Sequence, residues 1–231
     1  MKKSHIAMLI VCFLLIPLTL YFGTKLPGRS YYITGTAIII ELMLPFFMAF
    51  EGRKVQAREL VIIAVMCALA IVSRVAMPVP HFKAIFGVIM LSGIAFGPES
   101  GFMVGAISAF ASNFFYGQGP HTPWQMMAYG AGGMLAGFLF AEGRLPRKAW
   151  VMALFGGLTA ILWVGPLLDL SGIFLIPARI NWSSAMAIFL SGLYVNITQA
   201  ICTVFVMLIL GKPLLGIFDR VKLKYGVFEN R

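Results

Sequence analysis

Side chains that can bind a small polar molecule are concentrated in one short segment, SNFFYGQGPHTPWQM, at residues 112–126. Glutamine amides carry hydrogen-bond donors and acceptors, histidine titrates near neutral pH, and tryptophan offers a large flat surface. The residues concerned are Gln118, His121, Trp124 and Gln125. The Gly and Pro residues of the segment restrict its freedom before a ligand arrives, which favours a binding turn. A plain tight connector is the alternative interpretation.

Motifs of common enzymes are missing from the sequence. There is no GxxxxGK[ST] phosphate loop, because Gly211 and Lys212 are followed by Pro213, and there is no HExxH motif, GxSxG motif or close pair of carboxylates. The cysteines at positions 12, 67 and 202 lie singly in apolar runs, which argues against a disulfide framework or a zinc site. We therefore expect no catalytic residue, no metal and no cofactor in this chain.

The composition is that of an integral membrane protein. The chain is 60% hydrophobic and only 11% charged, which would leave a soluble domain without enough polar surface. Its formal charge of +10 does not indicate nucleic-acid binding, because the basic residues form short clusters between apolar runs. These clusters are typical of signals that set membrane topology.

Long uncharged runs predict transmembrane helices, since a spanning helix needs roughly 20 apolar residues. The candidate spans are residues 6–22, 31–50, 59–77, 84–98, 101–116, 123–141, 149–168 and 185–210. The predicted fold is therefore an all-α membrane bundle of about eight spans. The first run could instead be a secretory signal, although no small-x-small cleavage site follows it. The fourth and fifth spans, joined by GPESG, could form one hairpin that dips partway into the membrane.

The distribution of basic residues predicts that the N- and C-termini are both cytoplasmic. With that orientation most of the 18 Lys and Arg residues lie in the inner segments. The polar segment EGRKVQARE at residues 51–59 separates a two-helix leader, residues 1–52, from a six-helix remainder, residues 53–231, which ends in a basic cytoplasmic tail. The chain is expected in the cytoplasmic membrane as a multi-pass protein.

This orientation places three polar or aromatic loops on the outer face. They are the segment 112–126, the segment MPVPHFK at residues 77–83, and residues 169–184, which contain Asp169, Arg179, Asn181 and Trp182. Intramembrane polar groups are expensive and normally face the bundle interior. Asn113, Asn196 and Gln199 could form a cavity floor beneath the loops, and interhelical hydrogen bonding explains them equally well. Arg74 can snorkel or meet an anionic ligand group, and a pair with Glu41 would strain side-chain reach.

Small residues recur at four-residue spacing, which lets helices approach closely. The stripes are Ala64 and Ala68; Gly101, Gly105 and Ala109; and Ala128, Gly132 and Ala136. Packing within the bundle is the usual reason for such stripes. A stripe facing lipid would instead mark contact with a partner helix.

Three segments together resemble the substrate-binding S component of energy-coupling factor (ECF) vitamin transporters. They are ELVIIAVMCALAIVSRV (59–75), GVIMLSGIAFGPESGFMVGAISAFASNFFYGQGP (87–120) and TPWQMMAYGAGGMLAG (122–137). The resemblance covers about residues 57–225, and the turn is most similar to cobalamin-type S components. The two leading helices depart from the six-helix pattern of that family.

This resemblance implies a vitamin-binding subunit that works with other proteins. S components bind a vitamin from outside and associate with a membrane coupling subunit and two cytoplasmic ATPases, which use the ATP. The resemblance assigns Ala64 and Ala68 to contact with the coupling subunit. A shared fold does not fix the ligand, so the vitamin stays open.

We therefore predict a vitamin-binding subunit of an ECF-type importer, without catalysis. The predicted ligand contacts are Arg74, His81, Asn113, Gln118, His121, Trp124, Gln125, Asn181, Trp182 and Asn196. One alternative is a membrane enzyme for a lipid or isoprenoid substrate, with His81 or His121 as acid or base, which would need a carboxylate or metal partner. The other alternative is a membrane assembly or scaffold protein.

Overall fold

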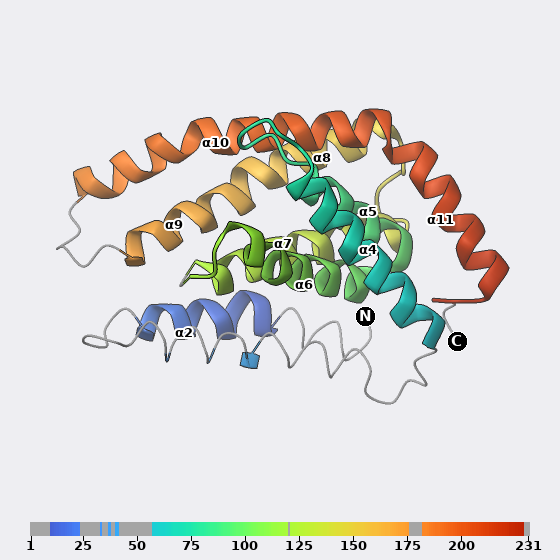
Figure 1. The fold of residues 1–231 in the computed structure, drawn as a ribbon, viewed down its shortest axis with the longest axis horizontal. Helices are drawn as coiled ribbons and strands as arrows, with labels where there is room; N and C mark the ends of the chain where they lie inside the picture. The colour runs from blue at the N-terminus through green and yellow to red at the C-terminus, as the bar shows by residue number, and fades with distance from the viewer. Residues whose placement is uncertain are drawn as a thin grey trace.

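The computed structural model describes residues 10–23, 33, 37, 40–41, 57–119, 121–175 and 182–228, and within these ranges every regular element is a helix. The π-helical segments are η1 (Val11–Leu15), η2 (Gly137–Ala141) and η3 (Ala160–Val164). The α-helices are α2 (Ile16–Gly23), α4 (Ala57–Val75), α5 (Ile85–Phe96), α6 (Pro98–Tyr116), α7 (Thr122–Ala136), α8 (Ala149–Thr159), α9 (Gly165–Leu175), α10 (Trp182–Ile209) and α11 (Gly211–Tyr225). Figure 1 shows α8 and α9 running alongside α10 and α6 running alongside α7.

The six spans predicted after residue 53 all correspond to helices. They are α4, α5, α6, α7 with η2, the continuous rod of α8, η3 and α9, and α10. Two of these are long and apolar enough to cross a membrane by themselves, Ala149–Gly172 with a mean hydropathy of 2.0 and Ala185–Ile209 with 1.8. The all-helical prediction is confirmed for the described residues, whereas the count of eight spans and the cytoplasmic termini stay predictions.

Helix α5 is the centre of the bundle. All of its residues except Val88 are buried, because α4, α6, α7, α10 and α11 pack around it. It has 12 residues, a length of about 18 Å at 1.5 Å per residue, which is short for a complete span. Gly97, with φ 99°, turns the chain directly into α6, whose first residue is Pro98. Neighbouring helices therefore shield α5 from lipid. Its short length fits the alternative in which residues 84–98 and 101–116 form one hairpin that dips partway into the membrane.

Glycines allow α5, α6 and α7 to touch backbone to backbone. A Cβ at Gly93 would lie 2.1 Å from the Gly133 carbonyl oxygen, and one at Gly101 would lie 2.3 Å from the same atom. At Gly105 the nearest atom would be the Tyr129 oxygen, 2.5 Å away. The small-residue stripes of α6 and α7 are therefore internal packing surfaces.

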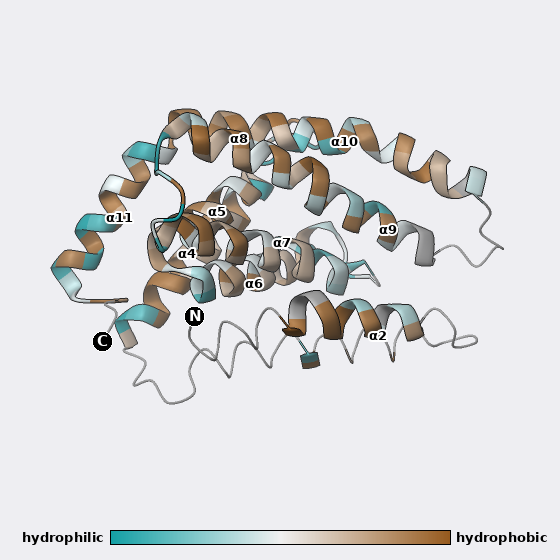
Figure 2. Ribbon diagram, turned by 180° about the vertical axis from the view of Figure 1, so that it is seen from behind, coloured by the Kyte–Doolittle hydropathy of each residue, from teal (hydrophilic) through white to brown (hydrophobic). Residues whose placement is uncertain are grey.

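Large apolar side chains cover the outside of the bundle. On α4 the exposed residues include Val61, Val65 and Leu69, and on α8 and η3 they include Leu154 and Leu162. Figure 2 shows such apolar positions along α8 and α10 as well. A soluble monomer rarely exposes so much apolar surface, so these faces are suited to lipid tails.

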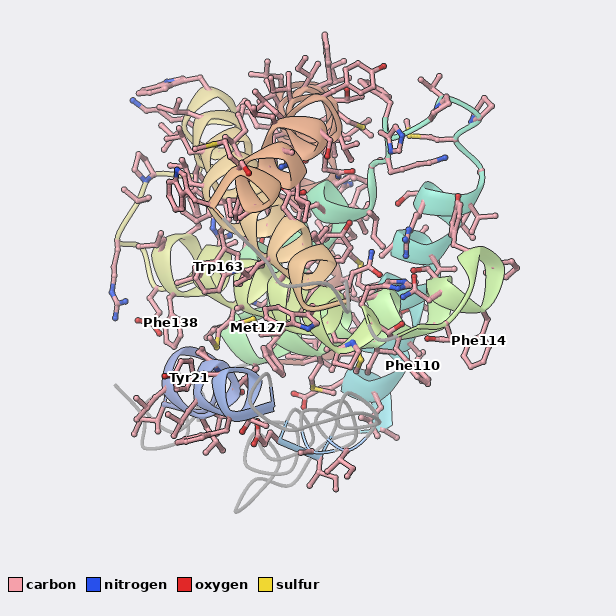
Figure 3. All side chains as sticks on the ribbon, turned by 90° about the vertical axis from the view of Figure 1, so that its left-hand side faces the viewer. Tyr21, Phe110, Phe114, Met127, Phe138 and Trp163 are labelled. Atoms are coloured by element: carbon pink, nitrogen blue, oxygen red, sulfur yellow. The ribbon has the colours of Figure 1, made fainter. Side chains whose placement is uncertain are left out.

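The leader helix α2 packs against the six-helix part. Val11 and Ile16 join a second buried cluster with Phe102, Trp124 and Met127. Figure 3 shows Tyr21 on α2 below the part of the bundle that carries Met127 and Phe138. Thr19 Oγ1 donates a hydrogen bond to Glu41 Oε1, so Glu41 has a partner other than Arg74, as expected. Most of the second predicted leader span, residues 31–50, lies outside the described residues.

Two helix boundaries differ from the predictions. Helix α9 continues to Leu175, so Asp169 is helical and not part of an outer loop. Residues 211–225, predicted as a basic tail, form helix α11, which crosses the end of the bundle where α4 begins (Figure 1). Its Lys222 Nζ donates to the Ala95 oxygen at 3.0 Å, and Arg147 Nη2 donates to the Ile94 oxygen at 3.0 Å. Two cations therefore cap the C-terminus of α5, where the helix dipole favours positive charge.

Candidate functional site

A network of polar side chains joins α4, α6 and α7 at the end of the bundle that carries residues 76–84, 117–119 and 121, here called the loop end. Arg74, in the last turn of α4, donates through Nη1 to Ser112 Oγ and, at 2.8 Å, to Asn113 Oδ1. Asn113 Nδ2 in turn donates to Thr122 Oγ1 at 3.0 Å and to Gln125 Oε1 at 2.9 Å. We call Arg74, Ser112, Asn113, Gln118, Thr122 and Gln125 the rim network.

The turn between α6 and α7 is tied into this network. Thr122 Oγ1 donates to Gln118 Oε1 at 3.0 Å and accepts a bond from the Gly119 amide at 3.3 Å. Gln118 Nε2 donates to the Phe110 oxygen at 2.8 Å, which anchors the turn on α6. Gly117 has φ 99°, a left-handed conformation that glycine adopts without strain. The turn is therefore held in one conformation, as a preformed site requires.

Asn113 is the centre of the rim network. Its side chain is completely buried, and its oxygen and both amide protons have hydrogen-bond partners. A buried amide without those partners would cost about 1–3 kcal/mol. In this structure the hydrogen bonds of Asn113 and Gln125 hold α4, α6 and α7 together.

Two cations lie against the ring of Tyr116, the last residue of α6. The Arg74 guanidinium carbon lies 4.7 Å from the ring centroid and Lys83 Nζ lies 5.8 Å from it. The Tyr116 hydroxyl donates to the Arg74 backbone oxygen at 2.9 Å, and Lys83 Nζ donates to the Met77 oxygen. The ion pairs between described residues, Arg144–Glu142 and Arg147–Asp219, involve neither cation.

His121 precedes α7 beside this cluster. Burial lowers the pKa of its imidazole, and the positive charge of Arg74 lowers it further. The ring is therefore neutral at pH 7 and can offer one donor and one acceptor.

The remaining predicted contacts lie elsewhere. Trp124 is buried in the cluster that contains Phe102 and Met127, so its role in this structure is packing. His81, with φ 60°, makes an edge-to-face contact with Tyr194 of α10 at 6.3 Å. Trp182 begins α10 and is 80% exposed. Asn196 is buried and donates to Asp169 Oδ2 at 2.7 Å, linking α10 to α9.

The structure thus brings together Arg74, Asn113, Gln118 and Gln125, with His121 adjacent. Asn181 lies outside the described residues. Sequence reasoning did not single out four further residues of this region, and these are Lys83, Ser112, Tyr116 and Thr122. Ser112, Tyr116 and Thr122 lie inside the quoted turn segment, so closer attention to its hydroxyl groups would have found them. Asp169 was grouped with an outer loop because the helix was ended too early.

Ala64 and Ala68 are exposed on α4, on the same lipid-suited face as Val61 and Val65. This stripe therefore differs from the internal stripes on α6 and α7. Small residues on an exposed face would let another helix approach closely.

Acid–base catalysis at His121 would need a partner that orients the imidazole. Among the described residues no group of three or more His, Cys, Asp or Glu side chains could hold a metal. The charged group that perturbs His121 is Arg74, a cation, whereas a catalytic base is normally oriented by a carboxylate or a metal.

Comparison with known proteins identifies the family. The family model described as the ECF-type riboflavin transporter, S component, matches residues 54–215. No match was found among curated proteins or among solved structures. The expectation of an S component is confirmed, while the closer likeness to cobalamin-type members is not, because the matching family is the riboflavin type. Since the match covers more than half of the chain, this protein belongs to the family of ECF-type riboflavin transporter S components.

Proposed function

We propose that this chain captures a vitamin at its loop end on the outer side of the membrane and delivers it inward when coupled to partner subunits. The observation that carries the proposal is the family match, which covers the helices that build the rim network. Because the family consists of transport components, the chain is not an enzyme. The rim network supports the proposal physically, since it fixes a polar turn before any ligand binds.

A flavin is the first vitamin to test. The family description names riboflavin, whose flat ring system has both donors and acceptors along one edge. Amides such as Gln118 and a neutral His121 offer the complementary groups, and the exposed ring of Tyr116 offers a stacking surface. A corrinoid of the cobalamin type is the second candidate, favoured by the sequence of the turn.

Energy for transport would come from a membrane coupling subunit and two cytoplasmic ATPases, as the family implies. The exposed positions Ala64 and Ala68 on α4 are the proposed contact with the coupling subunit. The chain itself lacks a phosphate loop, so it has no means of hydrolysing ATP.

Two measurements test this function. Mass spectrometry and visible absorbance of the molecules released from purified protein should reveal a flavin or a corrinoid, and release of a lipid intermediate alone would favour the enzyme alternative. Co-purification of the coupling subunit and the ATPases separates a transporter from a scaffold protein.

Orientation needs its own experiment. A Gly119→Cys variant in a Cys12→Ser background should react with a membrane-impermeant maleimide added to intact cells. The other two cysteines, Cys67 and Cys202, are both buried and give little background. A control with the Cys12→Ser chain alone measures that background. Reaction at residue 119 only after the cytosolic side is opened would contradict the proposed capture from outside.

A further inference from the structure

This inference rests on the proposed function and specifies the chemistry of its ligand. We propose that Arg74 and Lys83 form an anion site beside Tyr116, and that this site accepts a phosphate or carboxylate group. For a vitamin substrate, the preferred form is therefore a phosphorylated or acidic one.

Arg74 keeps part of its hydrogen-bonding fork unused. Both bonds to Ser112 and Asn113 come from Nη1, which leaves the Nη2 and Nε protons without an acceptor among the described residues. A guanidinium binds phosphate or carboxylate through two parallel N–H groups. The side that the rim network does not use is therefore available for bidentate binding.

Lys83 supplies a second charge at the same ring. Its ammonium group donates to the Met77 oxygen, and of its three protons two have no acceptor among the described residues. The backbone oxygen of Lys83 accepts a bond from Gln199 Nε2 at 2.8 Å, so α10 fixes this part of the chain. Arg74 and Lys83 therefore converge on Tyr116 from two separate segments, with the backbone of each held in place.

No described carboxylate neutralises this pair of cations. The carboxylate of Asp169, on α9, accepts its hydrogen bond from Asn196 and not from either cation. Glu142 and Asp219 pair with Arg144 and Arg147 at the opposite end of the bundle. Because unpaired cations near a bilayer are costly, an arrangement that keeps two together favours an anionic ligand.

Tyr116 is half exposed, so the group that bridges the two cations can reach them from outside the bundle. A phosphate group on a soluble vitamin and the phosphate of a lipid headgroup share the same chemistry. The experiment must therefore distinguish these two sources.

The first arm compares riboflavin with riboflavin 5′-phosphate, using protein purified in a neutral detergent and flavin fluorescence as the readout. The unsubstituted protein should bind the phosphate form roughly tenfold or more tightly, as one charge-assisted hydrogen bond provides. The Lys83→Gln and Arg74→Gln variants should each reduce that preference several-fold. Lys83→Gln is the safer variant, because Lys83 is not part of the rim network. Lys148→Gln, an exposed cation near the opposite end, is the matched control and should leave the preference unchanged.

The second arm uses native mass spectrometry to compare retained phosphatidylglycerol with phosphatidylcholine of the same chain length. Phosphatidylglycerol retention that depends on Lys83 supports the anion site and assigns it to lipid. A flavin preference that depends on Lys83 supports the site and assigns it to the vitamin. If neither ligand depends on Arg74 or Lys83, the site is refuted, even where riboflavin binds well. If neither flavin binds, the flavin assignment fails, and the lipid arm still decides the site.

Discussion

Replacing Asn113 with alanine should loosen the whole loop end. The change removes three hydrogen bonds, those to Arg74 at 2.8 Å, Gln125 at 2.9 Å and Thr122 at 3.0 Å. Thr122 keeps its bonds to Gln118 and Gly119, so the groups left unpaired are the buried Gln125 oxygen and one Arg74 proton. At about 1–3 kcal/mol for each of these two groups, we expect a loss of roughly 2–6 kcal/mol.

The adjacent Ser112→Ala variant is the matched control. It removes one of the two acceptors of Arg74 Nη1 and the bond at 3.2 Å that Ser112 Oγ donates to the Ala109 oxygen, and it leaves Asn113 bonded to Gln125 and Thr122. We expect it to cost about 1–2 kcal/mol, the value of two typical hydrogen bonds. Both variants lie on the same helix and both side chains are completely buried, so a difference between them reports the network and not burial.

Thermal unfolding in detergent, followed by the fraction of protein that stays monodisperse after heating, measures the effect. A chain of this size loses about 2–4 °C for each kcal/mol, so Asn113→Ala should melt roughly 4–24 °C lower and Ser112→Ala about 2–8 °C lower. If Asn113→Ala melts as high as Ser112→Ala, the bonds to Gln125 and Thr122 contribute nothing, and the rim network is not the frame of the site.

The remaining predictions concern pH, packing and assembly. The pKa of His121 is lowered in the folded protein, so at pH values below about 6.5 the unfolded chain binds more protons than the folded one. The stability of the fold therefore falls as the pH falls through about 6.5. Melting temperatures at pH 7.5 and pH 5.5 should differ more for the unsubstituted chain than for His121→Gln. Gly101→Ala places a Cβ 2.3 Å from a carbonyl oxygen and should prevent stable folding, whereas Gly216→Ala, which meets nothing within 4 Å, should be neutral or stabilising in a melting assay. An Ala64→Trp and Ala68→Trp double variant should keep vitamin binding and lose co-purification with the coupling subunit; normal co-purification would show that α4 is not the contact.

The sequence alone predicted the helices well because their limits have a local cause. Long apolar runs can bury their backbone polar groups in lipid only as helices, so the predicted span at residues 101–116 corresponds closely to α6, and that at residues 123–141 to α7 with η2. Where the cause was not local, the boundary was wrong. The acid at position 169 suggested a loop, but Asn196 on α10 satisfies its carboxylate, and the helix continues to Leu175.

The candidate turn was also found from the sequence, because amide, imidazole and hydroxyl groups are unusual in so apolar a chain. Their roles could not be predicted. The rotation of α7 decides whether Trp124 and Gln125 face a ligand or a neighbouring helix. That rotation is set by the backbone contacts at Gly101 and Gly133. As a result Trp124 packs against the leader and Gln125 bonds to Asn113.

The sequence by itself determined the class of the protein, a helical membrane component with a polar turn, because composition and apolar length are properties of the chain. Only the tertiary structure decided which polar groups are paired and which keep hydrogen-bonding capacity. Arg74 and Lys83 are nine positions apart on different segments, and they meet at Tyr116 because α4 and α6 pack together. The contact of both cations with the Tyr116 ring results from the packing of the helices, and no local sequence pattern predicts it.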